Sequence, residues 1–546
     1  MPVYKERYNI AFMRRKSILT MVCAAALAAG ANAQNPYLPM WEYIPDGEPY
    51  VFEDPDCPGK YRVYVYGSHD DLIDTYCGRD QVVWSAPVGD LSVWRYDGVI
   101  FTSVTDADGQ LLNPEGIGDI LYAPDVAVKT DADGKKKYYL YPNNQSGGRN
   151  GQIAVSDRPD GPFKVCNWSK TNPSLSDGVL TFDPGVFVDD DGRVYGYWGF
   201  EKSFGAELDP ETMATVKPGT EIVTDMVSNW YQEGVFRFFE ASSIRKIEDK
   251  YVFIYSRKTA DGEFGLPVSN YTLAYAYSDH PLGPWTYGGT LVDCRARDID
   301  DNGNTVMTAV PYGNTHGSIC EINGQWWCFY HRQTGLDQFS RQAMVAPVTV
   351  SVEKGPGGKV TISEAEYNSE GFCTEGLNPL NKSAAGWACW FKYPKGSSEK
   401  FPDFWFSGSY VKPTRLNANS FEGPFNLKQP YCPVVNNTSG SIVGYKYFNF
   451  DVLGKCASSR LVMHIKPEGV NGSIRVLVGG PDTAHGGKVI ATAVVLASDP
   501  QEIQKVSVMT EGLAGISGKQ PLFFSFASTE EDKSICELHD FQFVLD

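Results

Sequence analysis

The sequence predicts an all-β protein, and three observations lead to this expectation. Aromatic residues make up 13% of the 546 residues, apolar residues come mostly in short runs, and Asp-Gly or Asn-Gly pairs separate many of these runs. Such pairs favour the tight turns of β-hairpins. Helical periodicity is scarce. We therefore expect strands along the whole chain, whose length suits two domains.

The N-terminus has the order of a secretory signal. The basic residues RRK precede the apolar stretch SILTMVCAAALAAGA, and ANAQ follows it. We expect residues 1–33 to form a signal peptide cleaved after Ala33, so that the protein is exported to the periplasm or the extracellular space. A surface lipoprotein anchored at Cys23 is the alternative, but Val22 stands before it where a small residue is expected.

Charge and cysteine usage exclude several classes of partner. The formal net charge is -18, and no cluster of Lys and Arg occurs in the body of the chain. Nucleic acids and anionic membranes are therefore poor partners, and a neutral ligand fits better. The scattered cysteines lack the close CxxC spacing of zinc sites, so we expect most of them to be buried, with a disulfide or two as the alternative. No second segment approaches the length of a transmembrane span.

One pattern occurs five times between residues 44 and 332. A polar or charged residue starts a short apolar strand, a polar turn follows, and an aromatic-rich strand returns, as in FDPGVFVDDDGRVYGYWGF. The leading residues are Asp46, Asp125, Asp183, Glu240 and His316. Their spacing of 57 to 79 residues suits four-stranded blades with insertions. We therefore predict a five-bladed β-propeller over residues 34–353, in which the leading residues converge on one funnel.

Carboxylates gathered around one axis indicate sugar chemistry, because glycoside hydrolysis needs one protonated acid and one ionised partner. Phe238 and Phe239 are expected to exclude water from Glu240 and raise its pKa, and an ionised Asp125 nearby would raise it further. Asp46 lies between a proline and a glycine, in a more open and polar setting. We therefore predict Glu240 as general acid and Asp46 as general base. For any single Asp, a turn or capping role is the alternative.

Residues 35 to about 350 resemble glycoside hydrolase family 43, five-bladed propeller enzymes that act on arabinose- and xylose-containing glycans. The family's base motif matches Asp46 in YIPDGEPYVF, its APD motif matches Asp125, and its catalytic-acid strand matches Glu240 in FEASSIRKI. The resemblance implies that Asp125 tunes the pKa of the acid and orients it. One departure is the Ala-Ser pair after Glu240, where many members have Gly-Pro.

Further residues are expected near the sugar or a metal ion. The candidate substrate-binding residues are Asp183, Trp84, Trp198, His331 and Arg332. For Asp183 a structural role is the alternative, and for each tryptophan the alternative is core packing. His316 in HGSI resembles the family's axial histidine, which commonly approaches a calcium ion, often through water. The chemistry itself requires no cofactor.

The composition changes after Lys354 and indicates a second domain. EKGPGGKV predicts a flexible linker over residues 354–375, and alternating strands separated by turn residues predict a β-sandwich over residues 376–546. GYKYFNFD and LHDFQF resemble carbohydrate-binding module family 6, a jelly roll that often carries structural calcium. The resemblance implies Asp540 as a calcium ligand, with an ordinary solvated strand end as the alternative. Glycan binding and bracing of the propeller are equally compatible with this domain.

Together these features predict an exported inverting glycoside hydrolase that removes terminal α-L-arabinofuranosyl residues from plant cell-wall polysaccharides. The inverting outcome requires the two carboxyl groups to stand roughly 6.5–9.5 Å apart, with room for a water molecule. Three alternatives remain: a β-xylosidase, a galactan-acting enzyme of the same family, and a glycan-binding propeller without catalysis. The sequence does not reveal the oligomeric state or the exo or endo mode, because the loops around the funnel set the latter.

Overall fold

The computed structural model describes residues 34–546 except 73, 132, 310–312, 335–337, 394–407, 415–431 and 457. The predicted signal peptide, residues 1–33, lies outside the described residues. Within them the chain is all-β, as predicted, and four short 3-10 turns are the helices of this part. These turns are η1 (Glu263–Gly265), η2 (Ala385–Trp387), η3 (Leu453–Lys455) and η4 (Thr483–His485). No helix among the described residues is long and apolar enough to cross a membrane.

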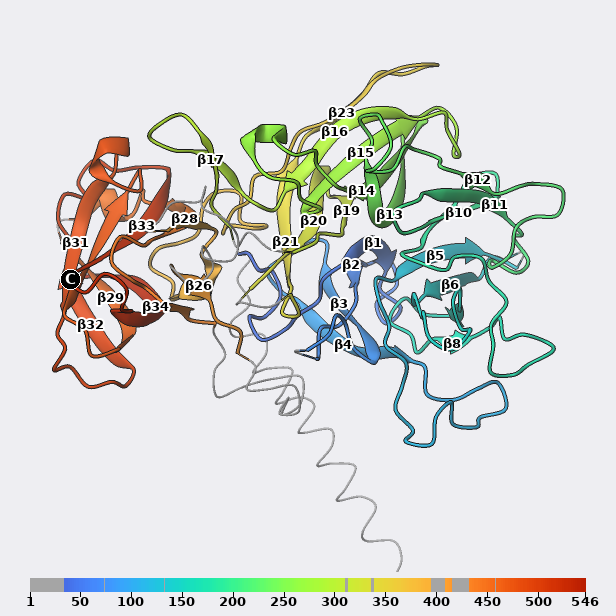
Figure 1. Ribbon diagram of the computed structural model, residues 1–546, viewed down its shortest axis with the longest axis horizontal. Coiled ribbons are helices and arrows are strands. Elements are labelled where there is room, and N and C mark those ends of the chain that lie inside the picture. The colour runs from blue at the N-terminus through green and yellow to red at the C-terminus, as the bar shows by residue number, and fades with distance from the viewer. Residues whose placement is uncertain are drawn as a thin grey trace, which may run out of the picture.

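Five open antiparallel sheets follow one another along residues 48–348, each in sequential strand order (Figure 1). The first contains β1 (Glu48–Glu53), β2 (Tyr61–Tyr66), β3 (Asp80–Pro87) and β4 (Arg95–Thr102), and the second contains β5 (Asp125–Thr130), β6 (Lys136–Tyr141), β7 (Ala154–Ser156) and β8 (Lys164–Val165). The third contains β9 (Gly185–Val188), β10 (Val194–Trp198), β11 (Phe204–Leu208) and β12 (Val223–Thr224). The fourth contains β13 (Phe238–Ile247), β14 (Lys250–Arg257), β15 (Thr272–Ser278) and β16 (Thr286–Asp293), and the fifth contains β19 (Ser318–Ile322), β20 (Gln325–Arg332) and β21 (Gln342–Val348). Two hairpins accompany them, β17 (Arg297–Ile299) with β18 (Thr305–Met307) and β22 (Val350–Val352) with β23 (Val360–Ile362).

The first strands of the five sheets lie beside one another. Strand β5 contacts β9, β9 contacts β13, β13 contacts β19, and β19 contacts β1. The hydroxyl of Tyr50 on β1 donates to Asp125 Oδ1 on β5 at 2.6 Å, which links the remaining pair. Gly185 permits one close approach, because a Cβ there would meet the carbonyl oxygen of Ser242 at 2.7 Å. The starts of these strands are therefore brought around a shared centre.

Hydrophobic clusters join neighbouring sheets. The alternating apolar strands of the first and second sheets share one cluster, as do those of the second and third and of the third and fourth. A further cluster joins the fifth sheet back to the first, with Phe329 and Val63 among its fully buried members. Each large apolar side chain buried in this way contributes about 1.5–3 kcal/mol, which fixes the sheets that carry the leading residues.

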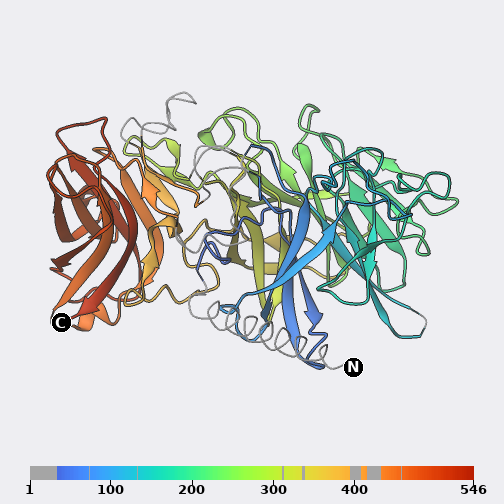
Figure 2. The ribbon, with the colours of Figure 1, turned by 90° about the horizontal axis from the view of Figure 1, so that it is seen from below.

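The C-terminal part contains two more sheets, which lie at one end of the molecule in both views (Figures 1 and 2). The six-stranded sheet contains β26 (Tyr410–Val411), β27 (Val434–Val435), β34 (Cys536–Leu545), β29 (Ser459–Pro467) and β32 (Gln504–Met509), with β24 (Ser383–Ala384) paired to β34. The five-stranded sheet contains β25 (Trp390–Lys392), β28 (Ile442–Asn449), β33 (Lys519–Ser528), β30 (Gly472–Val478) and β31 (Lys488–Val495). One hydrophobic cluster contains residues from both sheets.

The segment 354–375, which we expected to be a flexible linker, is packed instead. Strand β23 pairs with β22, and the side chains of Tyr367 and Phe372 are buried in the clusters of the first part. Trp390 and Phe523 of the C-terminal part belong to the same cluster as strands β14 and β20. The expectation failed because the Gly-rich turn that suggested it is followed by apolar residues that continue the core.

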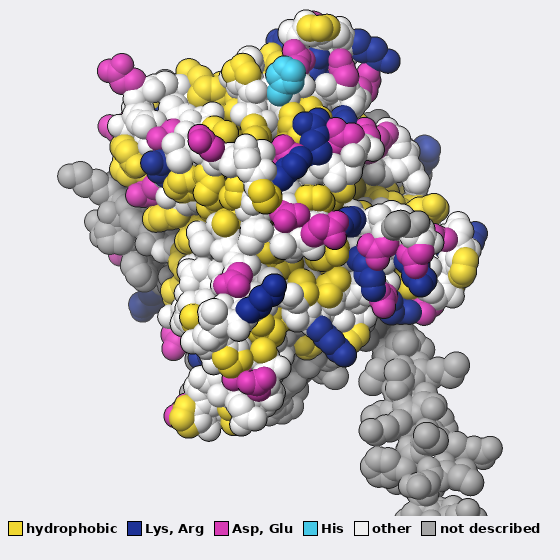
Figure 3. Space-filling view, turned by 90° about the vertical axis from the view of Figure 1, so that its right-hand side faces the viewer, with side chains coloured by type: hydrophobic (Ala, Val, Ile, Leu, Met, Phe, Trp, Pro, Cys, Tyr) yellow, Lys and Arg dark blue, Asp and Glu magenta, His cyan; other side chains and the backbone are white. Residues whose placement is uncertain are grey.

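Surface charge and cysteines agree with the sequence analysis. On the face that carries β5 to β12, acidic and basic side chains are interspersed, and no extended basic patch is seen on that face (Figure 3). All eleven cysteines of the described residues are free, and seven of them are buried. No two cysteines of the described residues form a disulfide, which was the alternative to buried free cysteines.

Candidate active site

Asp46 lies at the start of the first sheet with its carboxylate enclosed by cationic and hydroxyl donors. Its side chain is only 3% exposed, and its backbone adopts the left-handed region with φ 61°. Arg341 Nη1 donates to both carboxylate oxygens at 3.2 and 3.3 Å, and the Ser68 hydroxyl donates to Oδ2. Burial alone would raise the pKa of Asp46, but Arg341, His331, His316 and Ser68 together hold it below its usual value. This carboxylate is held ionised.

Arg341 and His331 are themselves fixed. The Arg341 guanidinium donates to both oxygens of Asp70, Nε to Oδ2 at 2.9 Å and Nη2 to Oδ1 at 2.8 Å. His331 Nδ1 accepts the backbone N–H of Asp46 at 3.2 Å, and its Nε2 lies 2.9 Å from the carbonyl oxygen of Asn314. These two contacts define the tautomer with the proton on Nε2, and burial lowers the pKa of His331 to about 4. The base is therefore oriented by neutral and cationic groups on β20 and just before β21.

Glu240 occupies a bulged stretch near the start of β13. The register between β13 and β14 shifts on both sides of it, and Ala241 has φ 67°. Asn314 Nδ2 lies 3.5 Å from Oε1. Burial raises the pKa of Glu240 to about 7, and the negative charges of Asp46 and Glu201 add to this, while Asn314 and Arg341 oppose it. The bulge thus aims one carboxyl group at the centre and keeps it protonated near neutral pH.

Asp183 lies beside this acid. Its Oδ2 accepts the backbone N–H of Ala241, the residue after Glu240, at 3.1 Å, and its Oδ1 accepts from Asn143 Nδ2 at 2.8 Å. Burial, then the charges of Glu240 and Asp46, raise the pKa of Asp183 well above its usual value. Asp183 is therefore a third carboxyl group in the same site, and its pKa depends on the charges of Asp46 and Glu240.

Asp125 has other partners than we predicted. Its carboxylate accepts from the Tyr50 hydroxyl and from the backbone N–H of Val186, both at 2.6 Å. Burial raises its pKa to about 6, against the pull of Tyr50 and Arg245. The charges that most strongly raise the pKa of Glu240 come from Asp46 and Glu201. We expected Asp125 to raise the pKa of Glu240 by like-charge repulsion. Other residues have this effect instead, because the start of β5 turns the Asp125 carboxylate toward β1 and β9.

His316 stands between two acids on the central axis. Its Nε2 lies 3.9 Å from Glu48 Oε1, and its Nδ1 lies 3.9 Å from Asp183 Oδ2. Within the described residues, His316 Nε2 and Glu48 Oε1 are buried and have no hydrogen-bond partner. No group of three or more metal-ligating side chains occurs in this part of the chain. Calcium takes six to eight oxygen ligands, so these two groups fit a shared water or a cation that keeps most of its own waters.

Four residues that we predicted to contact the sugar are buried and have other partners. Trp84 is 2% exposed and its indole N–H donates to Glu42, and Trp198 is 5% exposed and stacks on Phe204. Arg332 is 2% exposed, and its guanidinium donates to the carbonyl oxygens of Gly386 and Ala388 in the C-terminal part. The tryptophans are core residues because their strands are covered on both faces. His331, also fully buried, holds Asp46 and does not face a sugar.

Asp540 has partners that a calcium ligand would have to give up. Its Oδ1 lies 2.5 Å from His464 Nδ1, and its Oδ2 lies 2.9 Å from Lys382 Nζ. Both oxygens are thus engaged by basic side chains. A calcium role for Asp540 stays a prediction, and it would require the carboxylate to leave His464 and Lys382.

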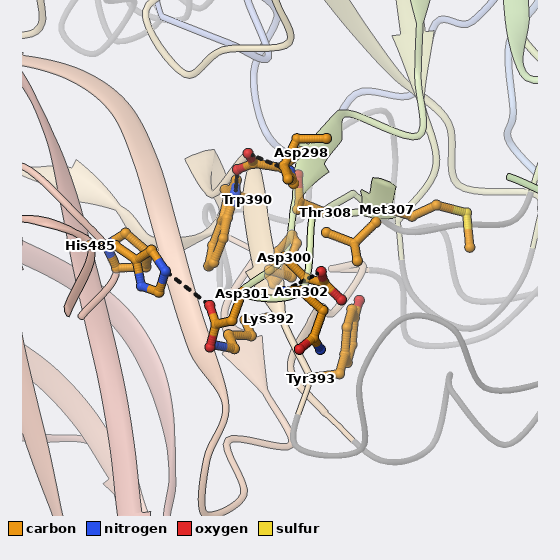
Figure 4. A pocket seen from close by; sticks show the side chains of 14 residues that line it. Asp298, Asp300, Asp301, Asn302, Met307, Thr308, Trp390, Lys392, Tyr393 and His485 are labelled. Carbon is orange, nitrogen blue, oxygen red and sulfur yellow. Dashed lines mark hydrogen bonds and ion pairs between the residues drawn. The ribbon is translucent and has the colours of Figure 1, made fainter. Parts of the chain in front are cut away.

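A cavity of about 330 Å³ lies away from this group, between the β17–β18 hairpin and the C-terminal part (Figure 4). Its lining includes Trp390, Tyr393 and His485 of the C-terminal part and residues 298–302 before β18. His485 Nε2 pairs with Asp301 Oδ1 at 2.9 Å across it. None of the carboxyl groups discussed above lines this cavity, so its size does not make it the reaction site.

Comparison with known proteins identifies the family. The family model described as glycosyl hydrolases family 43 matches residues 54–354, more than half of the chain. The chain belongs to glycosyl hydrolase family 43. A family relative, the "Xylosidase/arabinosidase" of Thermoclostridium stercorarium, is 35% identical over 442 residues, which are 76% of this chain and 82% of the relative.

Two further family 43 comparisons name arabinoxylan. The "Arabinoxylan arabinofuranohydrolase" of Paenibacillus polymyxa is 25% identical over 368 residues, which are 64% of this chain and 53% of that protein. The crystal structure of a family 43 arabinoxylan arabinofuranohydrolase from Bacillus subtilis, in complex with cellotetraose, is 20% identical. The alignment covers 95% of this chain and 99% of the Bacillus subtilis chain, with a TM-score of 0.45. The family model and the Thermoclostridium relative confirm the resemblance to family 43 that the motifs predicted.

Proposed function

We propose that this family 43 hydrolase is an inverting enzyme in which Asp46 is the general base and Glu240 the general acid. The observation that carries the proposal is the opposite pKa shift of two carboxyl groups in one buried group. An ionised carboxylate and a protonated one are what glycoside hydrolysis requires at neutral pH. The pair was chosen from the sequence, and the electrostatics of its neighbours support the same roles.

The proposed reaction proceeds in one displacement. Asp46 accepts a proton from a water molecule, and the oxygen of that water attacks the anomeric carbon from the face opposite the leaving group. As the glycosidic C–O bond breaks, Glu240 gives its proton to the leaving oxygen. The sugar leaves with inverted configuration and the aglycone leaves as an alcohol. The enzyme then carries its proton on Asp46, and exchange with solvent returns it to Glu240.

Asp183 takes the role that the family resemblance gave to Asp125. Its carboxylate accepts the N–H next to the acid and interacts with the charge of Glu240, so it favours the protonated acid and fixes the strand that carries it. Asp125 instead supports the neighbouring axial group of Tyr50, Arg245 and Glu48. A calcium ion held through water by His316 and Glu48 would supply positive charge at the centre.

The proposed substrate is a terminal α-L-arabinofuranosyl residue on a plant polysaccharide of the arabinoxylan type. The support is the name of the Paenibacillus relative, together with the neutral-ligand character of the acidic chain. A β-xylosidase is the second candidate, because the relative with the higher identity is named for both activities.

The architecture and location complete the proposal. We propose that the five sheets of residues 34–353 are the blades of a propeller, and that residues 376–546 form a β-sandwich of the carbohydrate-binding-module type. Contacts between consecutive first strands, and the shared cluster of the two C-terminal sheets, support this reading. We also propose that residues 1–33 direct export.

Hydrolysis of two matched aryl glycosides tests the proposal. Purified protein is incubated with 4-nitrophenyl α-L-arabinofuranoside and with 4-nitrophenyl β-D-xyloside, and the anomer first formed is followed by proton NMR. We expect release of arabinose with inversion, and no release by a Glu240→Gln, Asp46→Asn double variant. Retention of configuration, or no release from either glycoside, would refute the inverting hydrolase.

A further inference from the structure

Aromatic side chains from four segments lie near the strand that carries the proposed acid. We call Phe182, Phe200, Phe239, Trp230 and Tyr231 the acid-side aromatic group. The Phe200 ring lies 5.0 Å from Phe182 and 5.2 Å from Phe239, the residue that precedes Glu240. Trp230 and Tyr231 meet edge to face at 5.6 Å. Phe200 is 47% exposed and Tyr231 is 60% exposed, so part of the group faces solvent.

Backbone hydrogen bonds attach this group to the strand of the acid. The N–H of Glu201, next to Phe200, donates to the carbonyl oxygen of Phe239 at 2.6 Å. The N–H of Trp230 donates to the carbonyl oxygen of Phe238 at 3.1 Å, and Phe238 in turn donates to Ser228. The segments after β10 and before β13 are therefore fixed to the residues that carry Glu240. The aromatic rings hold their positions relative to the acid.

Trp230 is further oriented by charged neighbours. Its indole N–H donates to Glu201 Oε1 at 3.0 Å, and Lys258 Nζ lies 3.6 Å from the centre of its ring. Lys258 also lies 5.3 Å from the Phe239 ring. Glu201 is one of the charges that raise the pKa of Glu240. The same side chain thus contacts the aromatic group and acts on the acid.

We propose that the acid-side aromatic group binds the sugar on the leaving-group side of the scissile bond, a pyranose ring of the polysaccharide backbone. This proposal rests on the proposed function, because the general acid must lie against the leaving oxygen and the next sugar must follow it. A single exposed apolar side chain needs no explanation, but two sets of partly exposed rings attached to the strand of a functional group mark a binding surface. Neutral sugars present C–H faces that pack on aromatic rings, and the formal net charge of -18 disfavours an anionic ligand.

The test compares a substrate whose leaving group contains a sugar ring with a substrate whose leaving group does not. The variants are Tyr231→Ala, Phe200→Ala and Trp230→Ala, with Val494→Ala in the C-terminal part as control, since Val494 is 65% exposed on β31. The substrates are a xylo-oligosaccharide bearing one arabinofuranosyl group and α-L-arabinofuranosyl fluoride, whose leaving group has no ring. If the native enzyme prefers xylose, xylotriose and β-D-xylosyl fluoride replace them.

We expect the KM for the oligosaccharide to rise roughly three- to tenfold in each aromatic variant, as loss of one ring contact implies, with kcat on the fluoride within about twofold of native. The control variant should change neither value. An unchanged KM for the oligosaccharide, or an equal loss on both substrates, would overturn the proposal. Tyr231 and Phe200 are exposed enough to be removed without loss of the fold, which thermal unfolding checks. If the native enzyme hydrolyses neither substrate, the proposed function fails and not this inference alone.

Discussion

Asp46 is buried and Glu240 is half-buried, and their neighbours give these two interacting carboxyl groups opposite properties. Burial acts on both in the same direction and raises the pKa of each. Around Asp46, the guanidinium of Arg341 and the Ser68 hydroxyl reverse this effect. Around Glu240, other carboxylates add to it, and the weak 3.5 Å contact from Asn314 is too little to reverse it. The comparison teaches that partner charges, and not depth, decide which acid is ionised.

The largest expected effect comes from removing either carboxylate. Asp46→Asn should lower kcat about 10²- to 10⁴-fold on every substrate, because it removes the proposed general base. Glu240→Gln should lose as much on an oligosaccharide but retain much of its rate on a glycosyl fluoride, whose leaving group needs no proton. Steady-state kinetics on the two substrates measure this. Equal losses by both variants on both substrates would contradict the division of roles.

Arg341 is the residue that makes the two acids different. Arg341→Met leaves Asp46 and Asp70 buried without their cation and should lower the free energy of unfolding by about 3–5 kcal/mol. It should also raise the pKa of Asp46, so that the acidic limb of the rate profile moves to higher pH. Chemical denaturation and kcat/KM against pH measure the two effects. Arg341→Lys, which keeps the charge, is the control, and an acidic limb that stays in place in Arg341→Met would refute this role.

Variants of Asp183 and Asp125 test which of these two carboxyl groups tunes the pKa of Glu240. Asp183→Asn removes the carboxyl group that interacts with Glu240 and accepts the Ala241 N–H, so the proton of this coupled pair should be lost more readily and the basic limb of kcat/KM should move to lower pH, by about one pH unit. Asp125→Asn serves as the matched variant, because its carboxylate faces Tyr50 and Val186. We expect the basic limb to stay in place there. The reverse result would restore Asp125 as the residue that tunes the acid.

The smallest effect is expected at Arg332, which we first placed at the sugar. Arg332→Ala leaves the carbonyl oxygens of Gly386 and Ala388 without their donor and should cost about 1–3 kcal/mol of unfolding free energy. KM for the oligosaccharide should not change, because the side chain is buried at the junction with the C-terminal part. Thermal unfolding with parallel kinetics measures both. A raised KM without loss of stability would return Arg332 to the binding site.

The sequence predicted the parts of the site that a repeated strand pattern can mark. Asp46, Asp183, Glu240 and His316 lead equivalent strands, and their spacing alone indicated that they converge. The partners that decide the protonation states were missed, because Ser68 and Asp70 stand in a GSHD segment at the end of β2 and Arg341 precedes β21, where no pattern repeats. GSHD was a usable signal, since three of its four residues, Ser68, His69 and Asp70, are polar and stand just after a buried strand.

Burial was the property that the sequence predicted least well. Trp84, Trp198 and Arg332 have side chains that suit sugars, but each is covered by a neighbouring sheet that lies far away in the sequence. The exposed aromatic residues Phe200 and Tyr231 lie outside regular strands and carried no period that would have singled them out. The all-β class follows from local turn and strand chemistry, whereas the covered and open faces follow from long-range packing.

The pH dependence of kcat/KM for the native enzyme tests the central claim most directly. The account predicts a basic limb near pH 7, where Glu240 loses its proton, and an acidic limb below the usual range of an aspartate, where Asp46 gains one. Activity should therefore be high between these limits and fall as pH rises past about 7. A rate that already declines between pH 4 and 5 as the pH rises, or a Glu240→Gln variant that keeps the same basic limb, would contradict the account.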